Sequence, residues 1–388
     1  MHEGLKALPP FTFSLRTKIR FGSGVRSDLP EAVEAAHWKK IGVVIDHQII
    51  DLETFKGLLS DLEAAGSRLT VEACRISEPT YASLDKARQS FADRELDAMI
   101  GIGGGSALDM AKAMAVLVHN REPALAYRGF DKMAEPVLPI IAVPTTAGTG
   151  SEVTPNASFI DDQAKKKLGI NGEAVRPMLA FLDPELTVTC PMGPTVSAAA
   201  DSVVHAVEAY MAQKTNPMAR TLAREGVRRV FAALPRVVEN LSDLSAREDV
   251  MFGAFLSGLA LMHSGTGPAA ALSYPLGVHY GVPHGLGGAI FLPSVIEYNI
   301  EQGVYDYGDL VPGLSGTAEE MARLFLDRLT ALWEMLDIPR DLGRFGLSSA
   351  GVETFISDTM ELKGALDQNP APFGEKQART IVERLINN

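Results

Sequence analysis

Apolar and polar residues in the first half of the chain follow a pattern that predicts strands and helices in alternation. Residues 40–46 form an apolar run that ends in Asp46, which is typical of a strand buried on both faces. Similar runs predict further strands at 68–74, 98–102 and 138–143. Helical spacing between these runs predicts helices at 52–65, 81–93 and 106–119. Such alternation indicates parallel β-α-β units with helices on both faces of one sheet.

The second half of the chain has a different pattern, in which apolar residues recur at helical spacing. The segments with this spacing are 195–211, 217–234, 246–263, 317–336 and 374–386. Three prolines within residues 184–194 discourage regular structure and mark a linker. We therefore predict a Rossmann-like α/β domain with a parallel sheet over residues 1–190, and an all-helical domain over residues 191–388.

Composition and charge narrow the class of protein. A chain of 388 residues with 46% hydrophobic and 22% charged residues is expected to form two globular domains. The net charge of -12 argues against a nucleic-acid partner. Two distant cysteines, Cys74 and Cys190, favour a reducing compartment over a disulfide scaffold. Without a long apolar run or a signal-peptide pattern, we expect a cytoplasmic protein that does not enter a membrane.

A glycine cluster follows the strand predicted at 98–102. Gly103, Gly104, Gly105 and Ser106 lie where this strand ends and the next helix begins. Free N–H groups at a helix start attract phosphate, and glycine lets a ligand approach the backbone closely. The cluster is therefore a candidate cofactor site, with a simple tight turn as the alternative. Asp109, in the first turns of the helix, is either part of that site or a solvated surface residue.

A second glycine-rich loop, residues 144–152, follows the strand predicted at 138–143. It contains Thr145, Thr146 and Thr149, whose hydroxyls can bind a polar ligand at the carboxyl edge of a parallel sheet. Asp46 ends an earlier strand and can accept hydrogen bonds from a ribose 2′-hydroxyl while repelling a 2′-phosphate. Asp46 thus favours NAD over NADP, unless it is merely an acidic residue at a strand end.

The helical half supplies candidate metal ligands. Asp201 and His205 are four residues apart, so they project from the same face of a predicted helix. One carboxylate and one neutral imidazole at this spacing suit a divalent cation. Downstream, His284 adds another imidazole just before a further apolar helix. Isolated pairs of this kind also occur without a metal, so the alternative is a purely structural role.

The sequence resembles the iron-dependent (group III) alcohol dehydrogenase family. The matching motifs are GGGSxxDxAK at 103–112, PTTAGTGSE at 144–152, DP at 183–184, DxxxHxxEAY at 201–210, YPLG at 274–277, PHG at 283–285 and NP at 369–370. They follow the family order over nearly the whole chain. The resemblance implies the dehydroquinate synthase-like architecture, with a nicotinamide and a metal meeting between the two domains. It also implies oxidation of alcohols, or reduction of aldehydes and ketones, with NAD or NADP.

The resemblance assigns Asp201, His205 and His284 to a divalent metal, Fe2+ or Zn2+. The family usually has a further histidine at the position of Ala270, and another, linked to proton transfer, at the position of Tyr274. Three interpretations are open. The site holds a metal with three protein ligands, which is common for catalytic zinc; His263 or His279 replaces the missing imidazole; or metal dependence has been lost.

Taken together, these features predict an oxidoreductase that transfers a hydride between NAD(P) and a small polar alcohol or aldehyde. Tyr274, His279 and His263 are the candidates to relay the hydroxyl proton, although Tyr274 can equally be a core residue. Lys167 ends a run of three lysines that either meets an anionic ligand, such as a cofactor phosphate, or forms a solvated loop. The family resemblance implies a homo-oligomer, a dimer or larger.

Three alternatives to this function are open. The first is a metal-independent reductase of the same family. The second is a lyase of the dehydroquinate synthase type, for which basic substrate-binding residues are not evident. The third is a nucleotide-binding protein without catalysis, against which the joint presence of Asp201, His205 and His284 argues.

Overall fold

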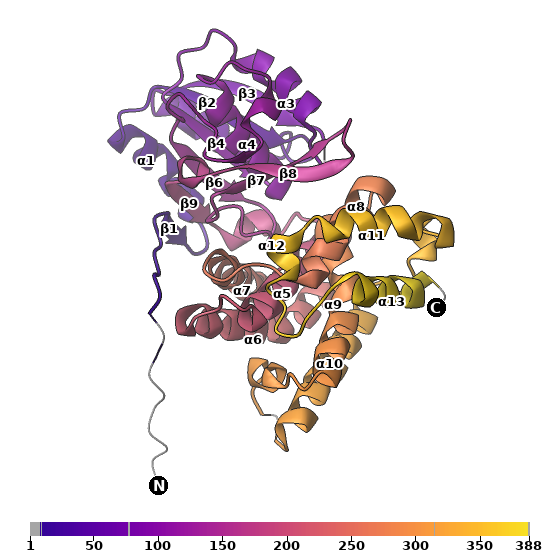
Figure 1. Ribbon diagram of the computed structural model, residues 1–388. Helices are drawn as coiled ribbons and strands as arrows, with labels where there is room; N and C mark the ends of the chain where they lie inside the picture. Colours follow the sequence, from indigo (N-terminus) through magenta and orange to yellow (C-terminus); the bar gives the residue numbers. More distant parts are fainter. Residues whose placement is uncertain (1–7, 9, 77, 314, 387–388) are drawn as a thin grey trace.

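The first half of the chain is built around a parallel sheet, as the sequence predicts. A computed structural model describes residues 8, 10–76, 78–313 and 315–386 (Figure 1). Six strands lie in the order β1-β9-β6-β4-β2-β3, and every neighbouring pair is parallel. Their bounds are β1 Lys18–Phe21, β2 Lys40–Asp46, β3 Arg68–Cys74, β4 Ala98–Gly103, β6 Ile140–Pro144 and β9 Leu179–Leu182. The carboxyl ends of β2, β4 and β6 therefore meet at one edge.

Helices cover this sheet: α1 Leu29–Ala35, α2 Glu53–Ala64, α3 Tyr81–Ala87 and α4 Gly105–Leu117. The helix predicted at 81–93 is shorter than expected, because the chain tightens into a 3-10 turn over Arg88–Phe91. A second sheet was not predicted. It has the order β5-β8-β7, with β5 at Gly129–Phe130, β7 at Asn156–Asp161 and β8 at Lys166–Asn171. The lysine run thus enters a strand of an antiparallel hairpin.

The second half is helical, which confirms the predicted fold class. Its helices are α5 Met192–Met211, α6 Pro217–Glu239, α7 Leu244–Met262, α8 Pro268–Tyr280, α9 His284–Glu301, α10 Ala318–Met335, α11 Val352–Met360, α12 Lys363–Leu366 and α13 Glu375–Ile386. Further 3-10 turns lie at Val25–Asp28, Ala124–Tyr127, Glu173–Val175, Pro184–Thr187, Asp306–Leu310, Gly343–Phe345 and Ser349–Gly351. Figure 1 shows the six-stranded sheet with its own helices on one side of the molecule and the helices of the second half on the other. The exact boundary at residues 190 and 191 stays a prediction.

The loop that follows β6 packs directly onto the helices of the second half. A Cβ on Gly148 would lie 2.1 Å from the carbonyl oxygen of Ala198 in α5. A Cβ on Gly150, whose φ is +68°, would lie 2.8 Å from the Cα of Gly258 in α7. Both glycines are thus required by close backbone packing. The sequence predicted a ligand-binding role for the threonines of this loop, and the structure adds that its two glycines pack against the helices of the second half.

The remaining overall property concerns membranes. Among the residues that the structure describes, no helix combines the length and the apolar character needed to cross a bilayer.

Candidate active site between the sheet and the helices

The predicted cofactor residues meet at the carboxyl edge of the sheet. Asp46 ends β2 and Gly103 ends the neighbouring β4, where a Cβ on Gly103 would lie 3.0 Å from that of Asp46. Gly103 has a φ of +146°, which a side chain would strain. Gly104 caps α4, and a Cβ there would meet only Thr146, at 3.4 Å. The backbone at the start of α4 is therefore open to a close ligand approach.

The two glycine-rich loops contact one another. The N–H of Thr145 donates to the carbonyl of Gly103 at 2.9 Å. A Cβ on Gly105 would lie 2.7 Å from Cγ2 of Thr149, so only glycine lets the loops approach this closely. Ser106 follows within the first turn of α4. The structure thus brings these five positions to one end of one helix.

Asp109 has partners inside the protein. Its Oδ1 accepts a hydrogen bond from Oγ of Ser151 at 2.5 Å, and its Oδ2 accepts the N–H of Ser158 at 2.8 Å. One turn later, the fully buried Lys112 donates to the carbonyl oxygens of residues 154 and 156. The pair therefore ties the second glycine-rich loop to α4. A direct contact of Asp109 with the cofactor stays a prediction.

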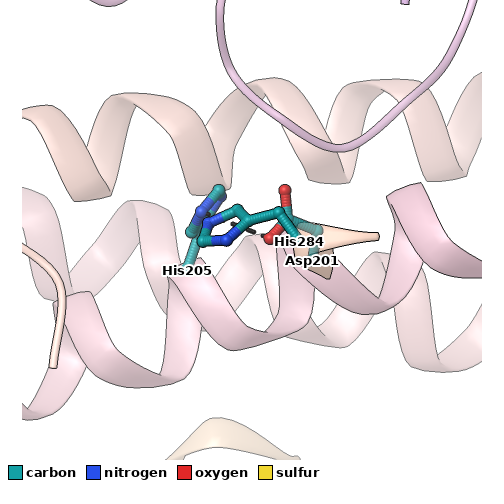
Figure 2. A group of neighbouring side chains, drawn as sticks. All are labelled: Asp201, His205 and His284. Atoms are coloured by element: carbon teal, nitrogen blue, oxygen red, sulfur yellow. Dashed lines mark ion pairs between the residues drawn. The ribbon is translucent and has the colours of Figure 1, made fainter. Parts of the chain in front are cut away.

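Three potential metal ligands converge from two helices. Asp201 and His205 lie one turn apart on α5, and His284 is the first residue of α9. Potential ligand atoms, one from each residue, all lie within 4.8 Å of one another, and Figure 2 shows the three side chains gathered together. Asp201 Oδ1 and His205 Nε2 are 3.4 Å apart. This is the group that the sequence predicted.

Gly285 explains how α9 comes so close to α5. A Cβ at this position would lie 2.4 Å from the carbonyl oxygen of Ser197 and 2.6 Å from Cβ of Asp201. Only a residue without a side chain therefore allows the first turn of α9 to pack against α5. The Pro-His-Gly motif thus joins the candidate ligand His284 to the glycine that allows its close approach to α5.

The electrostatics of these residues suit a cation. Burial raises the pKa of Asp201, and the neighbouring His205 and Lys167 lower it in part. Burial also holds the pKa of His284 well below its ordinary value, with further lowering by the charges of Lys167 and His205. His284 is therefore a neutral imidazole, the form that binds a metal. His205 Nδ1 is buried, and no described residue offers it a hydrogen bond. These residues fit a divalent cation, which would pair with the buried carboxylate.

Helix α8 carries the two departures from the family pattern. Ala270 is buried and has no donor atom on its side chain. Tyr274 lies one turn later, with its ring centroid 5.0 Å from that of His284. Burial raises the pKa of Tyr274, and the nearby Lys167 ammonium lowers it in part. Tyr274 thus lies beside a predicted ligand, and its role as a proton relay stays a prediction.

Lys167 faces the site, and the solvated-loop interpretation is wrong for it. Its side chain is only 10% exposed, and its Nζ lies 2.5 Å from Oε2 of Glu78. The same Nζ lies 5.8 Å from the centroid of the Tyr274 ring. The preceding Lys166 instead pairs with Glu361 at the surface. Alternation along β8 sends successive side chains to opposite faces.

His263 and His279 are not brought to the site. His263 stacks on Phe13 at 4.1 Å between centroids, and its Nε2 lies 3.0 Å from the carbonyl of Ser14. His279 Nε2 lies 2.6 Å from Oδ2 of Asp358. In the part of the chain that the structure describes, the ligand group contains neither. The interpretation that one of them replaces the missing imidazole is therefore wrong, and a relay role for either stays a prediction.

Glu208 is a site-supporting residue that the sequence analysis did not single out. Its carboxylate accepts N–H bonds from Gly267 and Ala269, each at 2.7 Å, and from Ala270 at 3.3 Å. It therefore caps the start of α8. Burial raises its pKa to about 7, although the backbone N–H groups lower it in part. The available signal was its position three residues after His205, which places both on one side of α5.

Comparisons with known proteins identify a family that matches both halves of the chain. Residues 16–184 match the family model described as iron-containing alcohol dehydrogenase. Residues 195–386 match the model for the C-terminal part of the Fe-containing alcohol dehydrogenase family.

Individual relatives match over most of their length. The chain is 32% identical over 370 residues to long-chain-alcohol dehydrogenase 1 of Geobacillus thermodenitrificans, covering 93% of each chain. It is 28% identical over 348 residues to the NAD-dependent methanol dehydrogenase of Bacillus methanolicus, covering 88% of this chain and 91% of that one. The solved structure of an alcohol dehydrogenase from Oenococcus oeni is 25% identical, with a TM-score of 0.91 over 97% of this chain and 100% of that one.

Proposed function

The chain belongs to the iron-containing alcohol dehydrogenase family, and we propose that it interconverts a small polar alcohol and its aldehyde with NAD and a divalent metal. Asp201, His205 and His284 hold the metal, Fe2+ or Zn2+. The observation that carries this proposal is the convergence of their ligand atoms to within 4.8 Å, together with a buried His205 Nδ1 to which no described residue offers a hydrogen bond. Three protein ligands leave a position for substrate or water, as in many catalytic zinc sites.

Each side of the site has its own task. When bound, NAD takes up the hydride of the carbinol carbon and the metal polarises the substrate oxygen. The first glycine turn and the start of α4 bind the diphosphate through backbone N–H groups. Asp46, at the neighbouring strand end, accepts the ribose hydroxyls and repels a 2′-phosphate, so NAD is preferred over NADP.

Tyr274 handles the proton in this scheme. Oxidation of the alcohol releases one hydroxyl proton in addition to the hydride, and in this proposal the Tyr274 hydroxyl passes it on. Lys167 supports this role: burial raises the pKa of the Tyr274 phenol, and the buried Lys167 ammonium, 5.8 Å from the ring centroid, offsets part of that rise. The Tyr274 hydroxyl and the Lys167 ammonium are two polar groups beside the proposed ligands, and they also favour a polar substrate.

The same pair of residues supports a second candidate, a metal-independent reductase. In that case Tyr274 donates the proton that neutralises the developing alkoxide, and the Lys167 ammonium stabilises the charge on the phenol oxygen. The absence of a donor at Ala270 favours this candidate, because a three-ligand site holds a metal less strongly than a four-ligand site.

Metal analysis combined with an alcohol panel tests the proposal. We expect about one equivalent of divalent metal per chain and NADH formation with small polar alcohols. His284→Ala should lose the metal and lower turnover at least about 100-fold. His119→Ala, which removes an exposed imidazole hydrogen-bonded to the carbonyl of Pro136 outside the group, should retain both. Turnover that survives complete chelation but disappears in Tyr274→Phe would select the metal-independent reductase, and unchanged metal content in His284→Ala contradicts the ligand assignment.

A further inference from the structure

We infer that Ser273 is a positioning residue, which fixes the proton of His284 on Nδ1 and leaves Nε2 as the nitrogen that faces the cation. The inference rests on the proposed function only in identifying the cation as the ligand. Ser273 lies on α8 and is 1% exposed. Its Oγ is 2.7 Å from the carbonyl oxygen of Ala270 and 2.7 Å from Nδ1 of His284.

The number of protons decides how these two contacts are made. A serine hydroxyl has one proton, and the Ala270 carbonyl oxygen can only accept. If the hydroxyl donated to His284, two oxygen atoms would face one another at 2.7 Å with no proton between them. If the hydroxyl donates to Ala270, the Nδ1–H of His284 donates to Oγ, and both contacts are satisfied. Since a metal-binding imidazole carries a single ring proton, Nε2 is then bare.

The surroundings of Ser273 hold this arrangement in place. Glu208 fixes the start of α8 by accepting the N–H groups of Gly267, Ala269 and Ala270. On the other side, a Cβ on Gly287 would lie 3.0 Å from Cβ of Ser273, so α8 and α9 pack closely at this point. The Ser273 hydroxyl therefore has little freedom to turn away from His284.

The orientation of His284 by Ser273 matters more in this chain than it would in a site with four protein ligands. The carbonyl oxygen of Ala270 accepts the hydrogen bond from the Ser273 hydroxyl, but its side chain has no donor atom for the cation. Each of the three remaining ligands therefore carries a larger share of the affinity. Partners that orient a metal-binding imidazole are typically worth about 10-fold to 100-fold in metal affinity. We expect Ser273 to contribute within that range.

The first test is a Zn2+ titration of Ser273→Ala against a matched control. Ser257 is also buried in a helix, and its hydroxyl donates to the carbonyl of Gly253 at 2.8 Å without touching an imidazole. We expect Ser273→Ala to weaken Zn2+ binding about 10-fold to 100-fold, and Ser257→Ala to leave it near the wild-type value. Ser273→Cys, with a weaker acceptor, should fall between the two.

The second test measures the proton directly in metal-free protein labelled with 15N-histidine. The His284 signals are assigned by their loss in His284→Ala. We expect the Nδ1–H form in the wild type and in Ser257→Ala, and a shift toward the Nε2–H form in Ser273→Ala. Because this readout needs no metal, it tests Ser273 even if the wild type fails to bind Zn2+, which would contradict only the proposed metal site. Retention of the Nδ1–H form in Ser273→Ala, or its absence from the wild type, would overturn the inference.

Discussion

The two sides of the site are built in different ways. The proposed nucleotide side consists of backbone, with Gly103, Gly104 and Gly105 adjacent in sequence at the start of one helix. The proposed cation side consists of side chains, with Asp201 and His205 on α5 and His284 on α9. The first side depends on the absence of Cβ atoms, whereas the second depends on the presence of donor atoms. Adding a donor atom at Ala270 is therefore expected to change metal affinity by degrees. Adding a Cβ at a closely packed glycine is expected to disrupt the packing outright.

The largest expected effect tests whether the second glycine-rich loop is structural as well as ligand-binding. Gly148→Ala places a Cβ 2.1 Å from the backbone oxygen of Ala198, which cannot move without shifting α5. We expect the free energy of unfolding to fall by about 3 kcal/mol or more. Gly104→Ala, where only Thr146 is near, should lose less than about 1 kcal/mol but raise the KM for NAD. Denaturant titrations measure the difference, and equal stability of the two variants contradicts it.

The next largest effect concerns Glu208, the buried carboxylate that caps the start of α8. Burial raises the pKa of Glu208 from its ordinary 4.5 to about 7, so the folded state favours its protonated form. This preference adds up to about 3 kcal/mol to the free energy of unfolding. The contribution is fully present below pH 4.5 and is lost as the pH rises through about 7. Glu208→Gln should flatten the pH dependence of the unfolding free energy over this interval.

Glu225 provides the control for Glu208. Hydrogen bonds from Arg228 lead the effects that lower the pKa of Glu225 to about 2, so its contribution is lost only as pH falls. Glu225→Gln should therefore leave the slope between pH 5 and 7 unchanged. An equal slope in wild type and Glu208→Gln would show that the Glu208 carboxyl is not perturbed.

A smaller effect is expected from completing the cation side. Ala270→His adds an imidazole to the buried part of α8 where the family usually has one, and we expect Zn2+ affinity to rise about 10-fold. Ala270→Leu adds bulk without a donor atom and should show no gain. Calorimetric titration compares the two variants, and a similar affinity in both would mean that the fourth position does not point to the metal.

The smallest effect is on the nucleotide side. Asp46→Gly removes the carboxylate that discriminates against a 2′-phosphate, so the ratio of kcat/KM for NAD over NADP should fall about 3-fold to 10-fold. Asp51→Gly changes an exposed acid in the loop after β2 and serves as the control. The same ratio in wild type and Asp46→Gly would remove the assigned role of Asp46.

The contrast between the two sides also explains what the sequence could predict. The glycine turn was predictable because a buried apolar strand, three glycines and a helix follow one another without a break. The pairing of Asp201 with His205 follows from helical geometry alone. Their meeting with His284 depends on how α9 packs against α5, which single-sequence periodicity does not encode. The family motifs, and Gly285 among them, supplied that information.

Other features escaped prediction for local physical reasons. The lysine run left a ligand-facing role and a solvated loop both open, because charged residues usually cluster at surfaces; strand alternation, which was not predicted there, turns Lys167 inward and Lys166 outward. Glu208 stands in the motif at 201–210 but received no role, because its helix-capping function depends on N–H partners at the start of α8 that only the fold brings to it. His263 could serve as a ligand only if the helix broke between it and Ala270. The helix does break there, but Phe13 and Ser14, distant in sequence, contact His263 away from the site.

The contact between Gly150 and Gly258 has a practical consequence for recombining members of the family. Although the chain changes from sheet to helices near residue 190, the loop that follows β6 packs closely against α5 and α7. An exchange of halves cut at the linker would therefore join a loop from one parent to helices from another. A chimaera that takes residues 144–153 from the same parent as its helices should fold more readily than one divided at the linker.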